Sequence, residues 1–356
     1  SQHTTRIKLV TDARIGFCCK MLTDQSFVDR KSAQAWLTAH NTRTTTVAHL
    51  DTLSKSAVVD KIVDIITHNQ QALMAQFTAM SAWPVNLRMV RVGSELLPVR
   101  TFERYMDVYD QPVVQKALQG FQAVGDLARQ WDIRLSSHPG QFTILTSATP
   151  AVVDRAVQDL EYHAEIFRLM GYLSTDHRQE INIHGGARRD DFVPAFLHGL
   201  SRVSADCQAW LSVENDEFSY GLDQLLPLAD HVKICVDIHH HWINTGSYLD
   251  PSDSRLLRVI ASWRGARPEM HVAQTAESVI GDHARDQLPC MDQLLAAGFK
   301  RGKLRAHSDQ MWNTALNSYA LQFWDRFDLC CECKSKNLGS HQLWLHNQSA
   351  YTPVLS

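Results

Sequence analysis

Short runs of β-forming residues alternate with amphipathic helical stretches along this chain, and this alternation constrains the fold more than any other feature. Strands that alternate with helices predict parallel βαβ units. The predicted strands are residues 14–18, 87–92, 133–136, 180–184, 209–214, 232–237, 269–273 and 328–332. We therefore expect an α/β protein with one domain over residues 1–356, folded as a closed (β/α)8 TIM barrel. A doubly wound open sheet is the alternative, but no Gly-x-Gly-x-x-Gly follows the first strand, which weakens a dinucleotide-binding fold.

The stretches between these runs have helical patterns. In residues 55–77 apolar side chains recur on one helical face, and Thr149 followed by Pro150 is a typical helix start. That helix is expected to end near Gly171, and residues 112–131 and 309–324 have similar patterns.

Composition excludes several classes of protein. The 356 residues contain 35 Lys and Arg against 38 Asp and Glu, so a strongly basic surface that binds nucleic acid everywhere is absent, although a local basic groove is not. No apolar run approaches about 18 residues, and residues 1–6 lack a signal-peptide core. We expect a cytoplasmic protein, nucleoid-associated if bacterial, with no membrane contact and no obligate protein partner. Adjacent cysteines make poor disulfides, so the eight cysteines are expected to be reduced.

Histidines and carboxylates gather where the predicted strands end. Six strand ends carry them, within residues 136–141, 181–186, 213–217, 236–241, 269–271 and 331–334. In a parallel barrel these ends open on one face, where barrel active sites lie. Any one of these side chains could be an ordinary loop residue or helix cap. Burying the histidines and carboxylates of six strand ends in one barrel mouth costs free energy unless cations neutralise the carboxylates. The six strand ends together therefore predict a metal site.

The donor types indicate which metals this site takes. Imidazoles and carboxylates without a thiolate favour Mn, Fe, Zn or Mg over a structural zinc. Carboxylates on several strands allow bridging, which favours a multinuclear cluster, and such clusters serve phosphoryl transfer. His283, in the loop after strand seven, is a further candidate ligand, whereas His307 is expected to make a hydrogen bond at a helix start.

These residues resemble the UV damage endonuclease family of TIM-barrel DNA-repair enzymes. The stretches that carry the resemblance are Arg14-Ile15-Gly16-Phe17, Arg91-Val92-Gly93-Ser94, Leu97-Pro98, His138-Pro139-Gly140-Gln141-Phe142, His184-Gly185-Gly186, Glu214-Asn215-Asp216, residues 225–228, Asp237-x-His239-His240-His241, Gly281-x-His283-Ala284 and Asp328 to Lys336. The resemblance implies a metal-dependent endonuclease that nicks damaged double-stranded DNA 5′ of UV photoproducts or other lesions. It also implies two or three divalent ions, with manganese expected and Fe, Zn or Mg as alternatives.

The same resemblance implies roles for individual residues. The implied metal ligands are His138, His184, Glu214, Asp237, His240, His271, His283 and Glu332. The family has a modified lysine two residues before the strand-seven histidine, and we hypothesise that Glu269, which stands there, replaces it as a ligand or through water. The residues expected to carry catalysis are His138, Glu214, Glu332 and Lys334. The residues expected to contact DNA are Phe17, Gln141, Phe142, Arg91, Lys334 and Lys336.

Two other functions remain open at this point. A metallo-barrel enzyme acting on a small molecule, such as a sugar isomerase or a multinuclear iron oxidase, has the same fold, because fold alone does not decide chemistry. Phe17 and Phe142 stand where the family has tyrosines, and these departures and Glu269 favour that alternative. A module that senses lesions without cutting would need a broken ligand set, whereas the set here is nearly complete.

Overall fold

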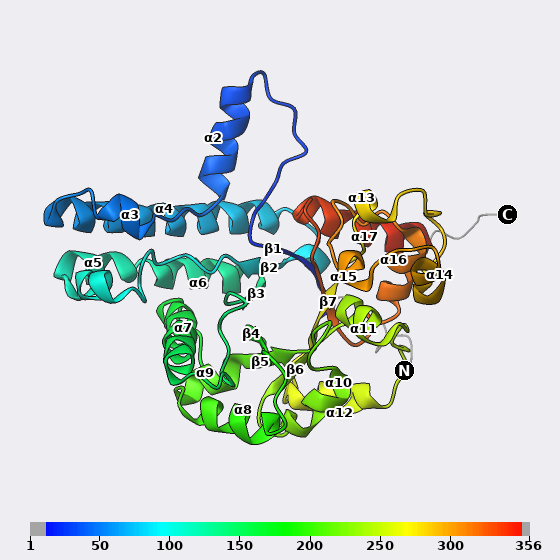
Figure 1. Ribbon diagram of the computed structural model, residues 1–356. Coiled ribbons are helices and arrows are strands. Elements are labelled where there is room, and N and C mark those ends of the chain that lie inside the picture. The colour runs from blue at the N-terminus through cyan, green and yellow to red at the C-terminus, as the bar shows by residue number, and fades with distance from the viewer. Residues whose placement is uncertain (1–11, 351–356) are drawn as a thin grey trace, which may run out of the picture.

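The computed structural model describes residues 12–350, and the predicted N-terminal segment 1–6 lies outside them. Its strands form a closed parallel barrel in chain order, surrounded by helices (Figure 1). The strands are β1 (Ile15–Cys18), β2 (Met89–Val92), β3 (Arg134–Ser137), β4 (Glu180–His184), β5 (Leu211–Glu214), β6 (Lys233–Asp237), β7 (Glu269–Val272) and β8 (Asp328–Cys331). The predicted TIM barrel and all eight strands are confirmed, with ends that differ by one or two residues.

The helices fill the connections between the strands. The α-helices are α2 (Arg30–His40), α3 (Val47–Leu50), α4 (Lys55–Ser81), α5 (Pro112–Leu118), α6 (Phe121–Gln130), α7 (Pro150–Leu169), α8 (Phe192–Ser201), α9 (Ala205–Trp210), α10 (Leu222–Leu225), α11 (Ile238–Thr245), α12 (Arg255–Ser262), α13 (Glu277–Ile280), α14 (Met291–Ala296), α15 (Arg301–Leu304), α16 (Thr314–Leu321) and α17 (Asn337–Ala350). Three 3-10 helices are η1 (Val85–Leu87), η2 (Glu103–Asp110) and η3 (Leu226–Leu228). The pattern over 112–131 is two helices, and that over 309–324 is only α16.

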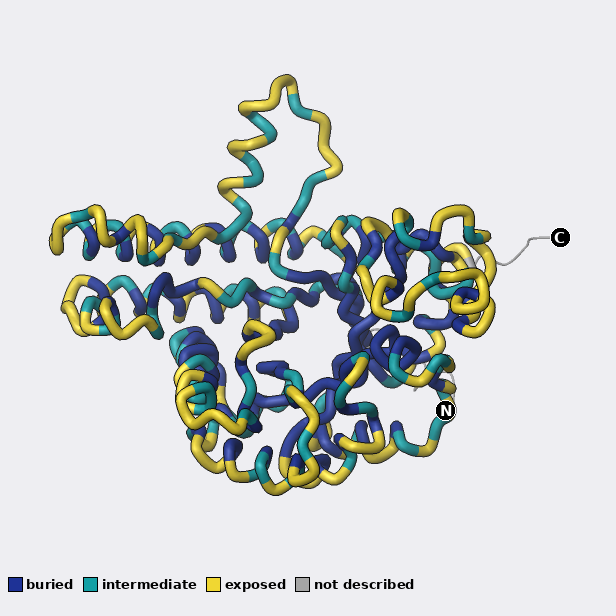
Figure 2. Tube along the Cα trace, in the orientation of Figure 1, coloured by how far each residue is buried: buried dark blue, intermediate teal, exposed yellow. Residues whose placement is uncertain are grey.

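The barrel strands alternate between two environments. The apolar core includes Ile181 and Ile183 of β4 and Leu211 and Val213 of β5. The alternate residues Glu180 of β4 and Ser212 of β5 meet inside the barrel, where the Ser212 hydroxyl donates to the Glu180 carboxylate. Because successive strand side chains point to opposite faces, the apolar set covers the outside, beneath the helices, and the polar set fills the interior. This alternation places the side chains at the strand ends in one polar mouth. Figure 2 shows the buried ring of strands inside more exposed helices.

One segment stands away from this body. The connection after β1 leaves the barrel and returns through α2, which has no buried residue and projects from the molecule in Figures 1 and 2. Asp29 caps α2 by accepting a hydrogen bond from Ser32 N at 2.7 Å. Within the described part of the chain, no helix combines the length and apolar character that a membrane span requires.

Candidate metal centre

The strand register brings the ends of four neighbouring strands to one level. His184 at the end of β4 is paired with Glu214 at the end of β5, and Asp237 at the end of β6 is paired with His271 of β7. Parallel strands expose these ends on the same face of the barrel. Glu332 follows β8 directly, so its carboxylate joins them from the neighbouring strand.

The ligand atoms form two groups that share Glu214. His138, His184 and Glu214 make one group, and Glu214, Asp237, His271 and Glu332 make the other; within each, one ligand atom per residue lies within 4.8 Å of the others. Glu214 Oε2 is 3.4 Å from His184 Nε2, and Glu214 Oε1 is 2.6 Å from His271 Nδ1. The two oxygens of one carboxylate therefore face two different groups, which is the arrangement that a bridging ligand needs.

The buried polar atoms at this point fit divalent cations. Glu214 Oε1, Asp237 Oδ2 and His271 Nδ1 are all buried, and among residues 12–350 their contacts with one another are ion pairs without hydrogen-bond geometry. Burying such atoms without well-formed hydrogen bonds is costly. A cation placed among them would satisfy all three, and imidazole with carboxylate is a donor set that Mn, Fe and Zn accept. The residues present therefore fit a divalent metal.

Charge coupling within the groups is strong. Burial would raise the pKa of Glu214 and lower that of His271, but their mutual attraction outweighs burial, so the pKa of Glu214 is lowered and that of His271 is raised. Burial raises the pKa of Asp237 to about 7. Without metal, His271 thus holds a proton at the place where a cation would sit.

Asn215 and the start of α11 fix the position of His240, a predicted ligand that lies outside both groups. Asn215 donates from Nδ2 to Asp237 O at 2.9 Å and accepts from Asp237 N at 2.8 Å. Asp237 caps α11 by accepting from His240 N at 2.8 Å. His240 Nδ1 donates to Asn215 O, and its Nε2 lies 3.5 Å from Glu217 Oε1. Burial lowers the pKa of His240, but Asp237 and Glu214 outweigh it and raise this pKa to about 9.

The imidazole ring of His138 is held in its neutral form. Its Nδ1 donates to Pro139 O at 2.7 Å, because a carbonyl only accepts, so Nε2 is left without a proton. Burial, together with the nearby Arg91, lowers the pKa of His138 to about 4. A neutral imidazole with a free Nε2 is the form that binds a metal.

Arg91 is placed differently from its prediction. Its side chain is 11% exposed, and Nη2 lies 3.0 Å from Glu332 Oε1 and 3.1 Å from His271 Nε2. β2 directs its guanidinium into the barrel, and its contact with DNA stays a prediction. The guanidinium compensates carboxylate charge inside the mouth.

The prediction for Phe17 is corrected. It is fully buried and its ring centroid lies 6.0 Å from that of Trp83, outside the barrel wall. Its neighbour Cys18 faces the interior, where its Sγ lies 3.4 Å from Cys330 Sγ. Strand alternation therefore puts Phe17 in the core, and it cannot wedge into DNA. All eight cysteines are unpaired, as predicted.

Glu269 does not join either ligand group. It lies two residues before His271 on β7 and thus one layer deeper in the barrel, where Ser136 Oγ donates to its Oε1 at 3.3 Å. Burial, and then the neighbouring Glu180, raise the pKa of Glu269 to about 8. Glu269 therefore lies outside both ligand groups, and its role as a ligand or through water stays a prediction.

The remaining predicted residues lie around the mouth. His283 is outside both groups, because its loop holds its ring 6.3 Å from Trp312 and its Nδ1 donates to Ala284 O. Gln141 and Phe142 are exposed on the loop that carries His138, and Phe142 is 80% exposed. Lys334 Nζ lies 3.6 Å from Asp309 Oδ1 on the surface after β8, and Lys336 follows it with φ 55°.

Three side chains near this site are not among the predicted ligands. Glu217 faces His240, Glu180 pairs with Glu269, and His163 is buried beneath the loops at the mouth. The signal for Glu180 was available, because Glu180, Asn182 and His184 alternate along β4 and must share one face.

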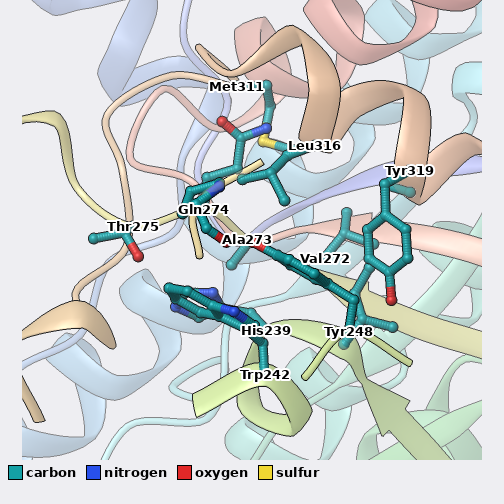
Figure 3. Close-up of a pocket in the computed structure, with 13 residues that line it drawn as sticks. His239, Trp242, Tyr248, Val272, Ala273, Gln274, Thr275, Met311, Leu316 and Tyr319 are labelled. Atoms are coloured by element: carbon teal, nitrogen blue, oxygen red, sulfur yellow. Dashed lines mark hydrogen bonds between the residues drawn. The ribbon is translucent and has the colours of Figure 1, made fainter. Parts of the chain in front are cut away.

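A small cavity nearby is not the functional site. Figure 3 shows His239, Trp242, Tyr248 and Tyr319 around it, between α11, β7 and α16. Its volume of about 20 Å³ is enough for one water molecule and excludes a substrate. Tyr319 OH donates to Leu249 O at 2.6 Å, and the other residues that line the cavity are mostly apolar.

Comparisons with known proteins agree with this geometry. The model of the family described as UV-endonuclease UvdE matches residues 16–345. The chain is 28% identical over 250 residues to the UV DNA damage endonuclease of Bacillus velezensis, covering 68% of this chain and 75% of that protein. It is 30% identical over 210 residues to the UV-damage endonuclease of Neurospora crassa, covering 54% of this chain and 31% of that protein. The chain thus spans about a third of the length of the fungal relative.

A solved structure shares the fold. The crystal structure of SacUVDE superposes with a TM-score of 0.68 at 18% sequence identity, over 96% of this chain and 100% of that one. At this level of identity the likeness establishes the barrel architecture and the order of its elements.

Proposed function

The chain belongs to the UV-endonuclease UvdE family, and from this premise we propose that it is a metal-dependent DNA-repair endonuclease. Its substrate would be damaged double-stranded DNA, nicked 5′ of UV photoproducts or other lesions. The observation that carries the proposal is Glu214, whose two oxygens face two separate ligand groups at the mouth of the barrel.

The two groups have distinct tasks in this proposal. His138 and His184 would hold one ion and Asp237, His271 and Glu332 the other, with Glu214 between them. Divalent ions held side by side supply positive charge that activates water and stabilises the charge developing on a phosphate. Arg91 keeps Glu332 oriented and ionised through its 3.0 Å contact.

We propose manganese as the metal and two or three ions as the number, with iron, zinc and magnesium as alternatives. The two groups would hold two ions, and His240 would be the candidate ligand for a further ion, because its Nε2 and Glu217 Oε1 face each other at 3.5 Å. Mixed imidazole and carboxylate donors suit manganese better than magnesium, because magnesium prefers ligands that are all oxygen atoms.

DNA contacts would come from the loops around the mouth. Gln141 and Phe142 are exposed beside His138, so they are placed to enter a duplex whose phosphate lies at the ions. Lys334 and Lys336 would contact phosphates, and Lys334 would add charge next to Glu332. Such a protein would act where the DNA is, in the cytoplasm and at the nucleoid of a bacterium, as one domain without an obligate protein partner.

The test uses a duplex with a single defined photoproduct and maps the cut position. With Mn²⁺ the protein is expected to cut the damaged strand 5′ of the lesion, and chelation is expected to abolish cutting. Glu214→Gln should be inactive, whereas Asp292→Asn, which removes an exposed carboxylate on α14, should behave as the wild type. Cutting that survives chelation would contradict the proposal, and bound iron without any cutting would favour a small-molecule enzyme instead.

A further inference from the structure

Two cysteine side chains meet inside the barrel where β1 and β8 run side by side. Cys18 Sγ lies 3.4 Å from Cys330 Sγ, and the two residues form a small buried cluster with Met89 of β2. All eight cysteines are free, so this pair is a dithiol. Its sulfur atoms are already in contact, which is the first requirement for a disulfide between them.

The two thiols differ in exposure and in charge. Cys18 is 7% exposed and Cys330 is 1% exposed, so an oxidant from solvent reaches Cys18 first. The hydrogen bond with Cys330, helped by the Arg91 guanidinium, lowers the pKa of Cys18 to about 7 against the effect of burial. The thiolate is the form of cysteine that peroxides oxidise, and a nearby positive charge is typical of reactive cysteines.

The dithiol is connected to the metal ligand Glu332 along two strands. Cys18 is the register partner of Arg91 on β2, and Cys19 N donates to Arg91 O at 2.7 Å. The guanidinium of Arg91 in turn lies 3.0 Å from Glu332 Oε1. On the other side of the pair, Cys330 precedes Glu332 by two residues, so the two side chains share one face. A movement of either cysteine therefore acts on the carboxylate of Glu332.

The end of β1 is the part of this pair that can move. β1 ends at Cys18, and Cys19 follows with φ 68°, in the left-handed region that favours glycine. Cys330 is held within β8, where it pairs with Gly16 of β1 and His271 of β7. A disulfide holds its sulfur atoms about 2 Å apart, so bond formation would draw Cys18 toward Cys330 by about 1 Å or more.

We propose that Cys18 and Cys330 are an oxidation-sensitive pair, which a peroxide converts to a disulfide that weakens metal binding at Glu332. The Cys18 thiolate attacks one peroxide oxygen; the O–O bond breaks, hydroxide leaves and a sulfenic acid forms. The Cys330 thiol then attacks the oxidised sulfur, so the S–S bond forms, the S–O bond breaks and water leaves. In total, two thiols and one hydrogen peroxide give one disulfide and two water molecules.

The consequence for the metal follows from the contacts of Arg91. Groups that orient metal ligands change metal affinity by about 10- to 100-fold when they are lost. A shift of Cys18 displaces its register partner Arg91, and with it the contact that orients Glu332. This inference concerns the metal centre alone and is independent of the substrate on which that centre acts.

The first test maps the disulfide. The whole chain is treated with a small molar excess of hydrogen peroxide, the remaining thiols are alkylated, and the peptides are analysed by mass spectrometry without reductant. The wild type should give a cross-link from Cys18 to Cys330, which Cys18→Ser and Cys330→Ser should lose. Cys19→Ser, at the neighbouring position, and Cys290→Ser, at an exposed position, are the matched controls and should keep it.

The second test measures Mn²⁺ binding by equilibrium dialysis. The oxidised wild type should bind Mn²⁺ about tenfold more weakly than the reduced protein, and dithiothreitol should restore the affinity. Cys18→Ser should bind Mn²⁺ equally well before and after peroxide, whereas Cys290→Ser should respond as the wild type does.

The outcomes separate this inference from the proposed function. A disulfide between other cysteines, or oxidation of Cys18 to a sulfinic acid without a cross-link, would overturn the pair. A cross-link with unchanged Mn²⁺ affinity would overturn its effect on the metal. If Cys330→Ser does not fold, as judged by thermal melting, Cys18→Ser decides the question. Failure of the reduced protein to cut damaged DNA would overturn the proposed function and leave both results on the pair in place.

Discussion

His184 and Glu214 lie opposite each other in the register of β4 and β5, with Nε2 of the histidine 3.4 Å from Oε2 of the glutamate. The other oxygen of Glu214 lies 2.6 Å from His271 Nδ1. One side chain thus joins the two halves of the candidate centre, and its position follows from strand pairing, which is rigid, and does not depend on a loop.

Glu214→Gln is expected to lower metal content at both groups and to reduce cutting by about a thousandfold, which corresponds to several kcal/mol of lost charge stabilisation. Removing His184 should empty mainly one group. The measurement is metal analysis of the purified variants beside their cutting rates. Full metal content in Glu214→Gln would show that this carboxylate is not shared.

Metal affinity is expected to rise with pH. Burial lowers the pKa of His240, but Asp237 and Glu214 raise it to about 9, and the pKa of His271 is also raised. A metal must displace these protons, so binding should weaken as pH falls from 9 to 6 and should release protons. Calorimetry in buffers of different ionisation enthalpy measures this release. Affinity that is constant over that range would count against both histidines as ligands.

Glu269→Gln is expected to keep full metal content and to be more stable than the wild type at alkaline pH. The folded-state pKa of Glu269 is about 8, against an ordinary value of 4.5. The unfolded chain therefore releases this proton first, and wild-type stability falls as pH rises from about 5 to 8. Glutamine has no such proton, so the variant should gain on the order of 3 kcal/mol over that interval. The measurement is the free energy of unfolding of both proteins in denaturant at pH 5 and pH 8. The same change with pH in the wild type and in Glu269→Gln would contradict a neutral Glu269.

The two aromatic residues predicted to contact DNA should behave in opposite ways. Phe17→Ala empties a core position and should cost about 3–5 kcal/mol of stability. Phe142→Ala alters a side chain that is 80% exposed, so its stability should change by less than about 0.5 kcal/mol while binding of damaged duplex weakens. Thermal melting and a binding titration on both variants provide the comparison. Unchanged DNA binding in Phe142→Ala would remove that residue from the interface.

The sequence was sufficient for the barrel and for most of its mouth. Alternating strand and helix patterns located β1 to β8 within one or two residues, and parallel topology then required His184, Glu214 and Asp237 to meet. Local sequence is enough here because each ligand ends its own strand.

The predictions that differ from the structure depend on which way a side chain points from its strand and how deep it lies in the barrel. All four residues of β1 are buried, so the burial pattern alone does not tell which of them face the barrel interior. The prediction that Phe17 contacts DNA is wrong because its side chain points to the core outside the strands. Glu269 is on the correct face but one layer too deep. The packing of α7 against the loop after β2 could not be predicted, because it depends on tertiary contacts such as that of Tyr162 with Leu97.

Anomalous diffraction at the manganese edge from crystals soaked in Mn²⁺ tests the shared centre most directly. The account predicts at least two peaks at the mouth of the barrel, one beside His138 and His184, the other beside Asp237 and His271, with Glu214 in contact with both. A single peak that Glu214 does not touch, or none at these side chains, would contradict it.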